Sequence, residues 1–86
     1  MKDAEQMSGR AAEPRTPVEA AISEIWAELL GLPRVGIHEN FLLLGGESLL
    51  AMQAASRIRK KFQYEISIRS IFVKTVAEVA AEISSR

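Results

Sequence analysis

Two glycines lead the chain to a serine that could carry a covalent group. Gly45 and Gly46 precede Glu47 and Ser48, and a segment with helical apolar spacing follows. Because glycine reaches positive φ and has no side chain, the pair predicts a sharp and uncluttered approach to the serine. Ser48 is expected to begin the helix and to act as its N-cap, with the hydroxyl on the exposed rim. The first-turn amides and the helix dipole favour a negatively charged group on that oxygen, so a phosphodiester could be attached there.

The same residues also allow a purely structural interpretation, in which the glycines make a loop and Ser48 caps a helix. A serine hydrolase is disfavoured, because Ser48 is not in a G-x-S-x-G elbow, the chain has one histidine and no strand leads into the turn. That histidine, His38, has no acid or nucleophile at a recognisable spacing and is expected to face solvent.

Composition limits the chemistry further. At 86 residues and 48% hydrophobic content, the chain predicts one small globular domain with little room for a deep active site. It has no cysteine, which excludes disulfides and thiolate metal sites, so any thiol chemistry has to come from a cofactor. No apolar run could span a bilayer and no secretory signal is recognisable, so we expect a cytoplasmic protein.

Charge is balanced overall but uneven along the chain. Residues 1–47 carry four basic and eight acidic side chains, and residues 48–86 carry seven basic and three acidic ones. The basic cluster comprises Arg57, Arg59, Lys60 and Lys61. It falls in the last turns of the helix after Ser48, where cations oppose the negative end of the dipole, and no aromatic platform accompanies it. Nucleic-acid binding is therefore not expected.

Two segments and an arm precede the serine. Residues 1–15 have no periodicity and are predicted to be a flexible arm or linker, whereas residues 16–86 are predicted to fold. Thr16 and Glu19 form a capping box for a helix that Gly31 ends. Its predicted apolar face is Val18, Ala21, Ile22, Ile25, Trp26 and Leu29, with Trp26 in the core. A long loop from residue 32 to 47 should bury Ile37, Phe41 and Leu44.

Three helices are predicted after the loop. The first runs from Ser48 to about residue 61 or 62, with an inner face of Ala51, Ala54, Ala55, Ile58 and Phe62. Ser67 caps a short helix carrying Ile68, Ile71 and Phe72, and a Thr75–Glu78 capping box opens a last helix with Val76, Val79, Ala80 and Ile83 inside. Leu49 and Met52 fall outside the inner face, and with Ile71 they are predicted to form a small partner interface. The expected fold is all-α.

Five stretches together form a larger pattern: residues 25–32 (IWAELLGL), 35–37 (VGI), 40–41 (NF), 44–49 (LGGESL) and 56–59 (SRIR). This pattern resembles the thiolation, or peptidyl carrier, domain of nonribosomal peptide synthetases, from about Pro17 to Ile83. The resemblance implies a four-helix bundle like that of acyl carrier proteins, with a long first loop and a short third helix. It also implies that Ser48, supported by Gly45, Gly46 and Glu47, receives 4′-phosphopantetheine from coenzyme A.

The chain departs from that family at three places. Many relatives have His or Asp at the position of Glu47, and an aromatic residue followed by an acidic one at the positions of Leu42 and Leu43. Relatives also tend to have a proline before the Thr-Val pair that opens the last helix, whereas Lys74 precedes Thr75 here. None of these changes removes the serine.

By this resemblance the protein is a noncatalytic carrier that holds an aminoacyl, aryl or peptidyl group as a thioester. The implied partners are a phosphopantetheinyl transferase, an adenylation enzyme or domain, and condensation, tailoring or thioesterase enzymes. No nucleic acid or membrane partner is expected, and the carrier should be a monomer. Two alternatives stay open: an acyl carrier of polyketide type, and a helical interaction module without a prosthetic group.

Overall fold

The structure is a computed structural model that describes residues 13–86. The arm predicted over residues 1–15 falls outside the described residues except for its last three, and the domain boundary at residue 16 stays a prediction. The described part contains four helices: α2 (Pro17–Leu30), α3 (Ser48–Phe62), α4 (Ile68–Val73) and α5 (Val76–Ser84). Its one β-type pairing is an isolated antiparallel bridge between Asn40 and Thr75. The predicted all-α class, long first loop and short third helix are confirmed.

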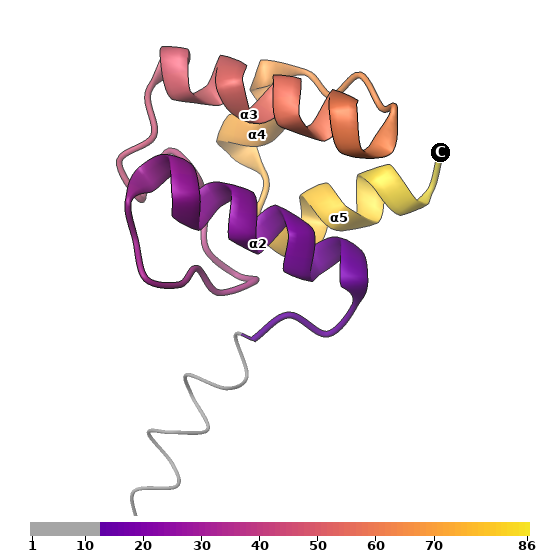
Figure 1. The fold of residues 1–86 in the computed structure, drawn as a ribbon, viewed down its shortest axis with the longest axis horizontal. Coiled ribbons are helices and arrows are strands. Elements are labelled where there is room, and N and C mark those ends of the chain that lie inside the picture. The colour runs from indigo at the N-terminus through magenta and orange to yellow at the C-terminus, as the bar shows by residue number, and fades with distance from the viewer. Residues whose placement is uncertain (1–12) are drawn as a thin grey trace, which may run out of the picture.

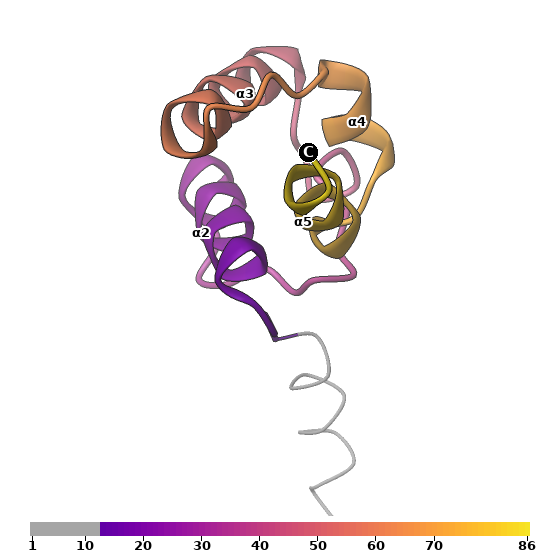
Figure 2. The ribbon, with the colours of Figure 1, turned by 90° about the vertical axis from the view of Figure 1, so that its right-hand side faces the viewer.

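The helices pack around a common centre. α2 contacts both α3 and α5, and α4 contacts α3. Figure 1 shows α3 above α2, with α5 beside α2 and α4 behind α3. Seen from the side in Figure 2, the four helices surround one interior. The short α4 therefore closes the bundle between α3 and α5.

The first helix has the predicted ends but a different N-terminal hydrogen-bond pattern. Thr16 Oγ1 accepts the amide of Glu19 at 3.1 Å, and Gly31 ends α2 with φ 69°. The Glu19 carboxylate accepts the amide of Arg15 at 2.7 Å and pairs with the Arg15 guanidinium, also at 2.7 Å. In a capping box that carboxylate would accept the Thr16 amide, so only half of the predicted box forms. The box at α5 forms completely, between Thr75 and Glu78.

The core is built from the predicted apolar faces. Trp26 is fully buried and meets the ring of Phe41 edge-on, with centroids 4.9 Å apart and planes at 67°. Such an aromatic pair adds about 0.5–1.5 kcal/mol beyond the area it buries. The other fully buried side chains come from every helix and from the loop: Ile22, Ile37, Ala51, Ala54, Ile58, Ile71, Val76, Val79 and Ile83. Leu44 of the loop, and Ala55 and Phe62 of α3, were predicted to face inward and are partly buried.

The loop between α2 and α3 is hydrogen-bonded to α2 near its beginning and to the start of α5 further along. The Ser23 hydroxyl of α2 donates to the carbonyl of Val35. Further along, the carbonyls of Ile37 and Glu39 accept the first two amides of α5, from Ala77 at 2.9 Å and Val76 at 3.1 Å. Those amides have no partner inside their own helix. The loop thus completes the start of α5, and α5 in turn fixes the path of the loop.

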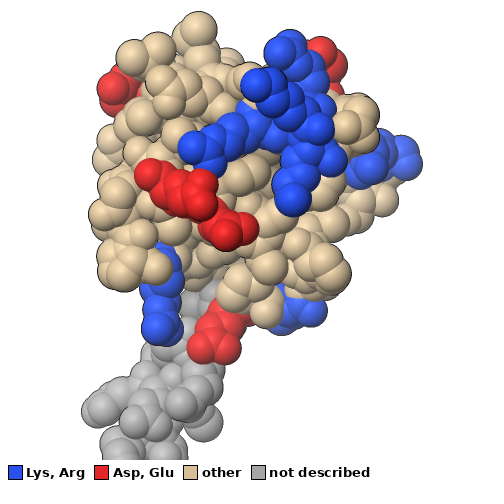
Figure 3. All heavy atoms as spheres, viewed as in Figure 1, with Lys and Arg blue, Asp and Glu red and all other residues tan. Residues whose placement is uncertain are grey.

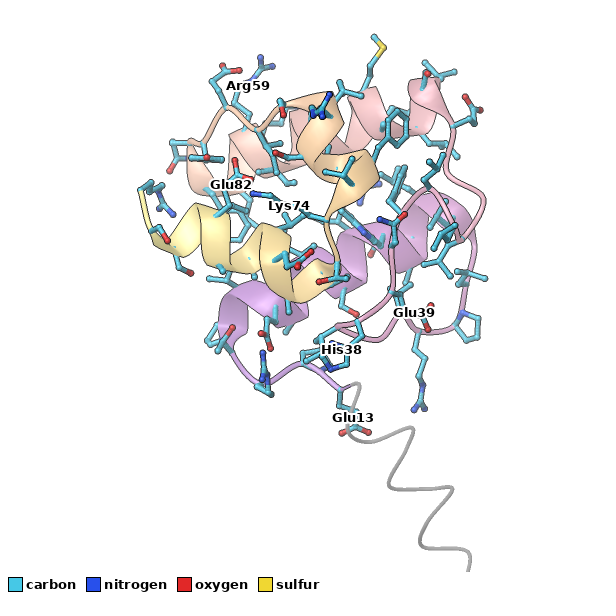
Figure 4. All side chains as sticks on the ribbon, turned by 180° about the vertical axis from the view of Figure 1, so that it is seen from behind. Glu13, His38, Glu39, Arg59, Lys74 and Glu82 are labelled. Atoms are coloured by element: carbon cyan, nitrogen blue, oxygen red, sulfur yellow. The ribbon has the colours of Figure 1, made fainter. Side chains whose placement is uncertain are left out.

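A polar network ties α5 to the segments on either side of α4. Glu82 accepts hydrogen bonds from Lys74 Nζ at 2.8 Å and from the Tyr64 hydroxyl at 2.5 Å. Figure 4 shows Lys74 and Glu82 directed toward one another. Burial raises the pKa of the Glu82 carboxyl, but the hydrogen bonds from Lys74 and Tyr64 outweigh it, so that the pKa is lowered overall. The same contact raises the pKa of Tyr64, whose hydroxyl proton is held by the carboxylate.

Neither a membrane span nor a metal-binding cluster occurs in the described part of the chain. None of the helices within residues 13–86 is long and apolar enough to cross a membrane. The same residues contain no group of three His, Cys, Asp or Glu side chains that could hold a metal ion.

Candidate attachment site at the start of α3

Ser48 is exposed at the first position of α3, where the long loop ends. The prediction that Ser48 is the N-cap is wrong, because Glu47 takes that role with extended backbone (φ −120°, ψ 179°). Glu47 Oε1 accepts the amide of Leu49 at 3.0 Å, which satisfies a first-turn donor. The Ser48 hydroxyl is therefore not needed for capping and stays on the surface.

Glycine is required at positions 45 and 46 for two different structural reasons. Gly45 has φ +102°, a conformation that residues with a side chain rarely adopt. Gly46 does not have positive φ, so only one glycine of the pair uses the conformation from which the sharp turn was predicted. Instead, a Cβ on Gly46 would lie 2.3 Å from two carbons of the Phe41 ring and 2.8 Å from the Phe41 carbonyl oxygen. Gly46 is thus required for close packing and Gly45 for backbone conformation.

A compact turn connects the core to Ser48. The amide of Gly46 donates to the Phe41 carbonyl at 2.9 Å, and the amide of Gly45 donates to the Leu42 carbonyl at 3.1 Å. Because Phe41 is buried against Trp26, this turn is anchored in the core two residues before the serine. The position of Ser48 is consequently set by packing as well as by the helix that follows.

Sequence reasoning assigned no role to Asn40, whose side chain makes three hydrogen bonds, one within its own loop and two to the end of α4. Its Nδ2 donates to the carbonyls of Phe72 at 2.8 Å and Lys74 at 3.3 Å, on either side of the end of α4. Its Oδ1 accepts the amide of Leu43 at 3.1 Å. The available signal was only that asparagine favours turns through such local bonds. Its long-range partners lie more than 30 residues away, which no local pattern indicates.

The charge next to Ser48 is the Glu47 carboxylate, which opposes an anion, so the attraction for a phosphodiester comes from the helix end itself. With the Leu49 amide bound by Glu47, the amides of Ser48 and Leu50 remain as first-turn donors. The basic side chains gather over the far part of α3, as Figure 3 shows on one face of the molecule. There Arg57 pairs with Glu28 of α2 at 2.5 Å. An exposed hydroxyl beside free helix amides fits a phosphodiester-linked group.

Two of the three residues of the predicted partner interface are exposed, and the interface itself stays a prediction. Leu49 and Met52 are both more than half exposed on α3, as the helical spacing indicated. Ile71 is fully buried, so its assignment to the interface is wrong. Its side chain belongs to the core, because α4 packs that face against α3. The exposed apolar residue of α4 is Val73. His38 is exposed, in agreement with its expected solvent-facing position (Figure 4).

Comparison with known proteins identifies the family. The family model described as "Phosphopantetheine attachment site" matches residues 20–83. The chain belongs to this family. It is a phosphopantetheine attachment domain, homologous to the carrier domains of nonribosomal peptide synthetases. The prosthetic group of the family, phosphopantetheine, agrees with the exposed hydroxyl and the absence of cysteine from the chain.

The chain spans about 1% of the length of the first curated relatives that it matches. It is 47% identical over 73 residues to a subunit of the linear gramicidin synthase of Brevibacillus parabrevis, a match that covers 84% of this chain and 1% of that protein. Among solved structures, it matches the peptidyl carrier protein solved with the phosphopantetheine transferase Sfp and coenzyme A. That match has a TM-score of 0.83 and 32% identity, and covers 87% of this chain and 99% of the other. A nonribosomal PCP domain matches with a TM-score of 0.71 and 43% identity, over 80% of this chain and 90% of that one.

Proposed function

We propose that Ser48 is the residue that carries phosphopantetheine, and that the domain is a noncatalytic carrier in nonribosomal peptide biosynthesis. The observation that carries this proposal is the exposure of Ser48 at the first position of α3, with its hydroxyl released from capping by Glu47. In the family match the serine lies inside the matched residues 20–83. The loop of Gly45, Gly46 and Glu47 supports the serine from its N-terminal side.

Loading needs only one group from this chain. Ser48 Oγ forms a new bond to the phosphorus that bears the pantetheine of coenzyme A and gives up its hydroxyl proton to a base of the transferase. The phosphoanhydride bond of coenzyme A breaks, and adenosine 3′,5′-bisphosphate leaves with its electron pair. The amides of Ser48 and Leu50 and the positive end of the α3 dipole favour the resulting phosphodiester.

The attached group supplies the thiol that the chain lacks. A thioester formed on that thiol holds an aminoacyl, aryl or peptidyl group in a state activated for attack by an amine. A single tethered copy also gives the acyl group a high effective concentration at each active site within reach. The domain itself contributes a rigid platform and an exposed serine, which is all that a carrier without catalysis requires.

The proposed partners follow from that role. The solved relative bound to Sfp supports a phosphopantetheinyl transferase as the partner that loads Ser48. Adenylation, condensation, tailoring and thioesterase enzymes would act on the loaded group, and Leu49 and Met52 would contact them beside the serine. Because the carrier must release each partner, a small interface of this kind suits it better than a large obligate one. The monomeric state and the cytoplasmic location remain predictions.

Intact-protein mass spectrometry tests the attachment residue directly. The purified chain is incubated with coenzyme A, magnesium and the transferase Sfp, and its mass is measured before and after. We expect one phosphopantetheine increment on the wild type and none on Ser48→Ala. Ser67→Ala is the matched control, because Ser67 is likewise an exposed serine at a helix start, and it should be loaded normally.

The mass separates the interaction module from a carrier, but it does not separate the two carrier types. An increment on Ser48→Ala would place the group elsewhere and contradict the proposal. No increment on a wild-type chain that circular dichroism shows to be folded, with several transferases, would favour an interaction module without a prosthetic group. A polyketide-type acyl carrier would be loaded at the same serine, and the two carrier types are separated by which acyl group a cognate enzyme then transfers to the thiol.

A further inference from the structure

The four helices within residues 13–86 begin with the same backbone hydrogen bond. In each, the carbonyl of the N-cap residue accepts the amide four residues further on, at 2.9 to 3.3 Å. The pairs are Thr16 with Ala20, Glu47 with Ala51, Ser67 with Ile71, and Thr75 with Val79. Each cap residue also has extended backbone. Glu47 therefore occupies at α3 the position that a threonine or serine occupies at the other three helices.

The hydroxyl groups at those three caps are used to hold their helices. Each accepts the amide three residues further on: Thr16 from Glu19 at 3.1 Å, Ser67 from Ser70 at 3.0 Å, and Thr75 from Glu78 at 3.2 Å. A capping hydroxyl oxygen is directed at backbone amides, and one of its two lone pairs is occupied by the hydrogen bond. A serine in a cap position is therefore a hindered nucleophile.

At α3 the cap and the hydroxyl belong to two consecutive residues. Glu47 Oε1 accepts the Leu49 amide at 3.0 Å, and Ser48 follows as the first helical residue with an exposed side chain. If the cap moved one residue along the chain, Ser48 would take the extended backbone. Its oxygen would then face the Ala51 amide, in the same relation that the other three caps show. The serine would hold the helix and would no longer be directed at solvent.

We propose that Glu47 is a positioning residue for loading, because its side-chain oxygen occupies the cap of α3 and so keeps Ser48 Oγ available as the nucleophile. The inference rests on the proposed function of Ser48. It adds that the loading rate depends on a residue that need not contact the transferase or coenzyme A. The contribution is made before any partner binds, through the choice between two neighbouring oxygens for the helix cap.

This role requires an acceptor oxygen at position 47 and not a charge. A carboxylate beside the phosphodiester opposes its negative charge, so the charge of Glu47 gives loading no advantage. Asparagine is among the best N-cap residues and is neutral, whereas alanine is a poor one. Glu47→Asn therefore keeps a capping oxygen and removes the charge, and Glu47→Ala removes both. The two variants separate capping from charge.

Loading kinetics test the inference. The rate of phosphopantetheine transfer by Sfp is measured against carrier concentration for the wild type, Glu47→Asn and Glu47→Ala. We expect Glu47→Ala to lower kcat about fivefold with KM nearly unchanged, because the transferase binds every molecule but reacts with the fraction whose hydroxyl is free. Glu47→Asn should keep the wild-type kcat. Thr16→Ala is the matched control, because it also removes a helix cap but lies outside the site, and it should keep both constants.

Nuclear magnetic resonance of the unloaded protein gives a second readout. The three-bond couplings between the α and β protons of Ser48 report its side-chain rotamer. We expect averaged couplings in the wild type and in Glu47→Asn, and the couplings of a single rotamer in Glu47→Ala, where the hydroxyl caps the helix. Glycine at an N-cap costs a helix less than alanine does. Glu47→Gly therefore replaces Glu47→Ala in both measurements if circular dichroism shows the alanine variant to be unfolded.

The outcomes separate this inference from the attachment proposal. A wild-type kcat for Glu47→Ala would overturn the positioning role. A raised KM in both Glu47 variants would also overturn it, since the transferase would then bind the carboxylate itself. Equal losses of kcat in the two variants would contradict the requirement for an acceptor oxygen. Failure of the wild type to load at Ser48 would contradict the attachment proposal instead, and the Ser48 couplings would still decide whether Glu47 keeps the serine out of the cap.

Discussion

At the scale of single residues, Glu47 caps α3 and Ser48 keeps an exposed hydroxyl. The sequence pointed to Ser48 through its glycines, and the structure keeps Ser48 exposed at the helix start. Capping, however, is performed by Glu47, which directly precedes the first helical residue and accepts the Leu49 amide through its carboxylate. This division leaves the serine hydroxyl available for chemistry while one of the first-turn amides is bound by Glu47.

The two glycines should respond differently to the same substitution. Gly46→Ala places a methyl group within 2.3 Å of the Phe41 ring, which is buried and cannot move away, so we expect a loss of about 3 kcal/mol in unfolding free energy. Gly45→Ala meets no neighbouring atom but has unfavourable φ, and should cost about 1–2 kcal/mol. Urea unfolding of both variants measures the difference. Equal losses would contradict the separate roles given to the two residues.

At the scale of elements, the helix ends depend on caps and on the loop. α2 and α5 both begin after a threonine N-cap, but the surrounding bonds differ. At α5 the Glu78 carboxylate also accepts the Thr75 amide, and the loop carbonyls bind the next two amides. At α2 the corresponding carboxylate of Glu19 binds Arg15. The first amides of α5 are therefore hydrogen-bonded to a distant part of the chain, whereas the hydrogen bonds at the start of α2 are local.

The caps should contribute unequally for this reason. We expect Thr75→Ala to lower the unfolding free energy by about 2 kcal/mol and Thr16→Ala by about 1 kcal/mol, the upper and middle parts of the range for N-cap removal. Thr75 caps the helix whose first two backbone amides also bind carbonyls of the loop before Ser48. Thr16 caps a helix start that makes no hydrogen bond to that loop. Chemical denaturation of the two variants gives the comparison, and a greater loss for Thr16→Ala would refute this explanation.

At the scale of the whole molecule, two carboxylates link stability to pH. Hydrogen bonds from the Arg15 side chain and backbone lower the pKa of Glu19, and those from Lys74 and Tyr64 lower the pKa of Glu82 against the effect of burial. A carboxyl whose pKa is lower in the folded state stabilises the fold above its ordinary value of 4.5. That stabilisation is lost as pH falls from this value through the folded-state pKa.

Acid unfolding should therefore be sensitive to Glu82. Urea titrations at neutral pH and at about pH 3, followed by the fluorescence of Trp26, should show a clear loss of stability in acid. Glu82→Gln should be less stable than the wild type at neutral pH. Its unfolding free energy should fall less on acidification, because only Glu19 then remains as a carboxyl with a lowered pKa. Parallel pH profiles for the two proteins would mean that the network around Glu82 does not contribute to the linkage. Trp26 is the only tryptophan and is fully buried, so its emission reports the core.

The sequence alone determined the elements and pointed to the proposed attachment residue. Apolar spacing placed the inner faces of α3 and α5, Gly31 ended α2, and Ser67 and Thr75 capped their helices as expected. These features are local, because caps, turns and helical periodicity depend on residues at most a few positions apart. The motif around Ser48 is equally local, which is why the family resemblance could be recognised from the order of the residues.

Only the tertiary structure decided which side chains are available on the surface and what holds the loop. Ile71 lies at a position that could be inside or outside a six-residue helix, and packing against α3 buried it and left Val73 exposed. Gly46 is required by the Phe41 ring, and Asn40 binds carbonyls more than 30 residues away. Contacts of this kind depend on how the helices pack, so the pattern of neighbouring residues does not determine them.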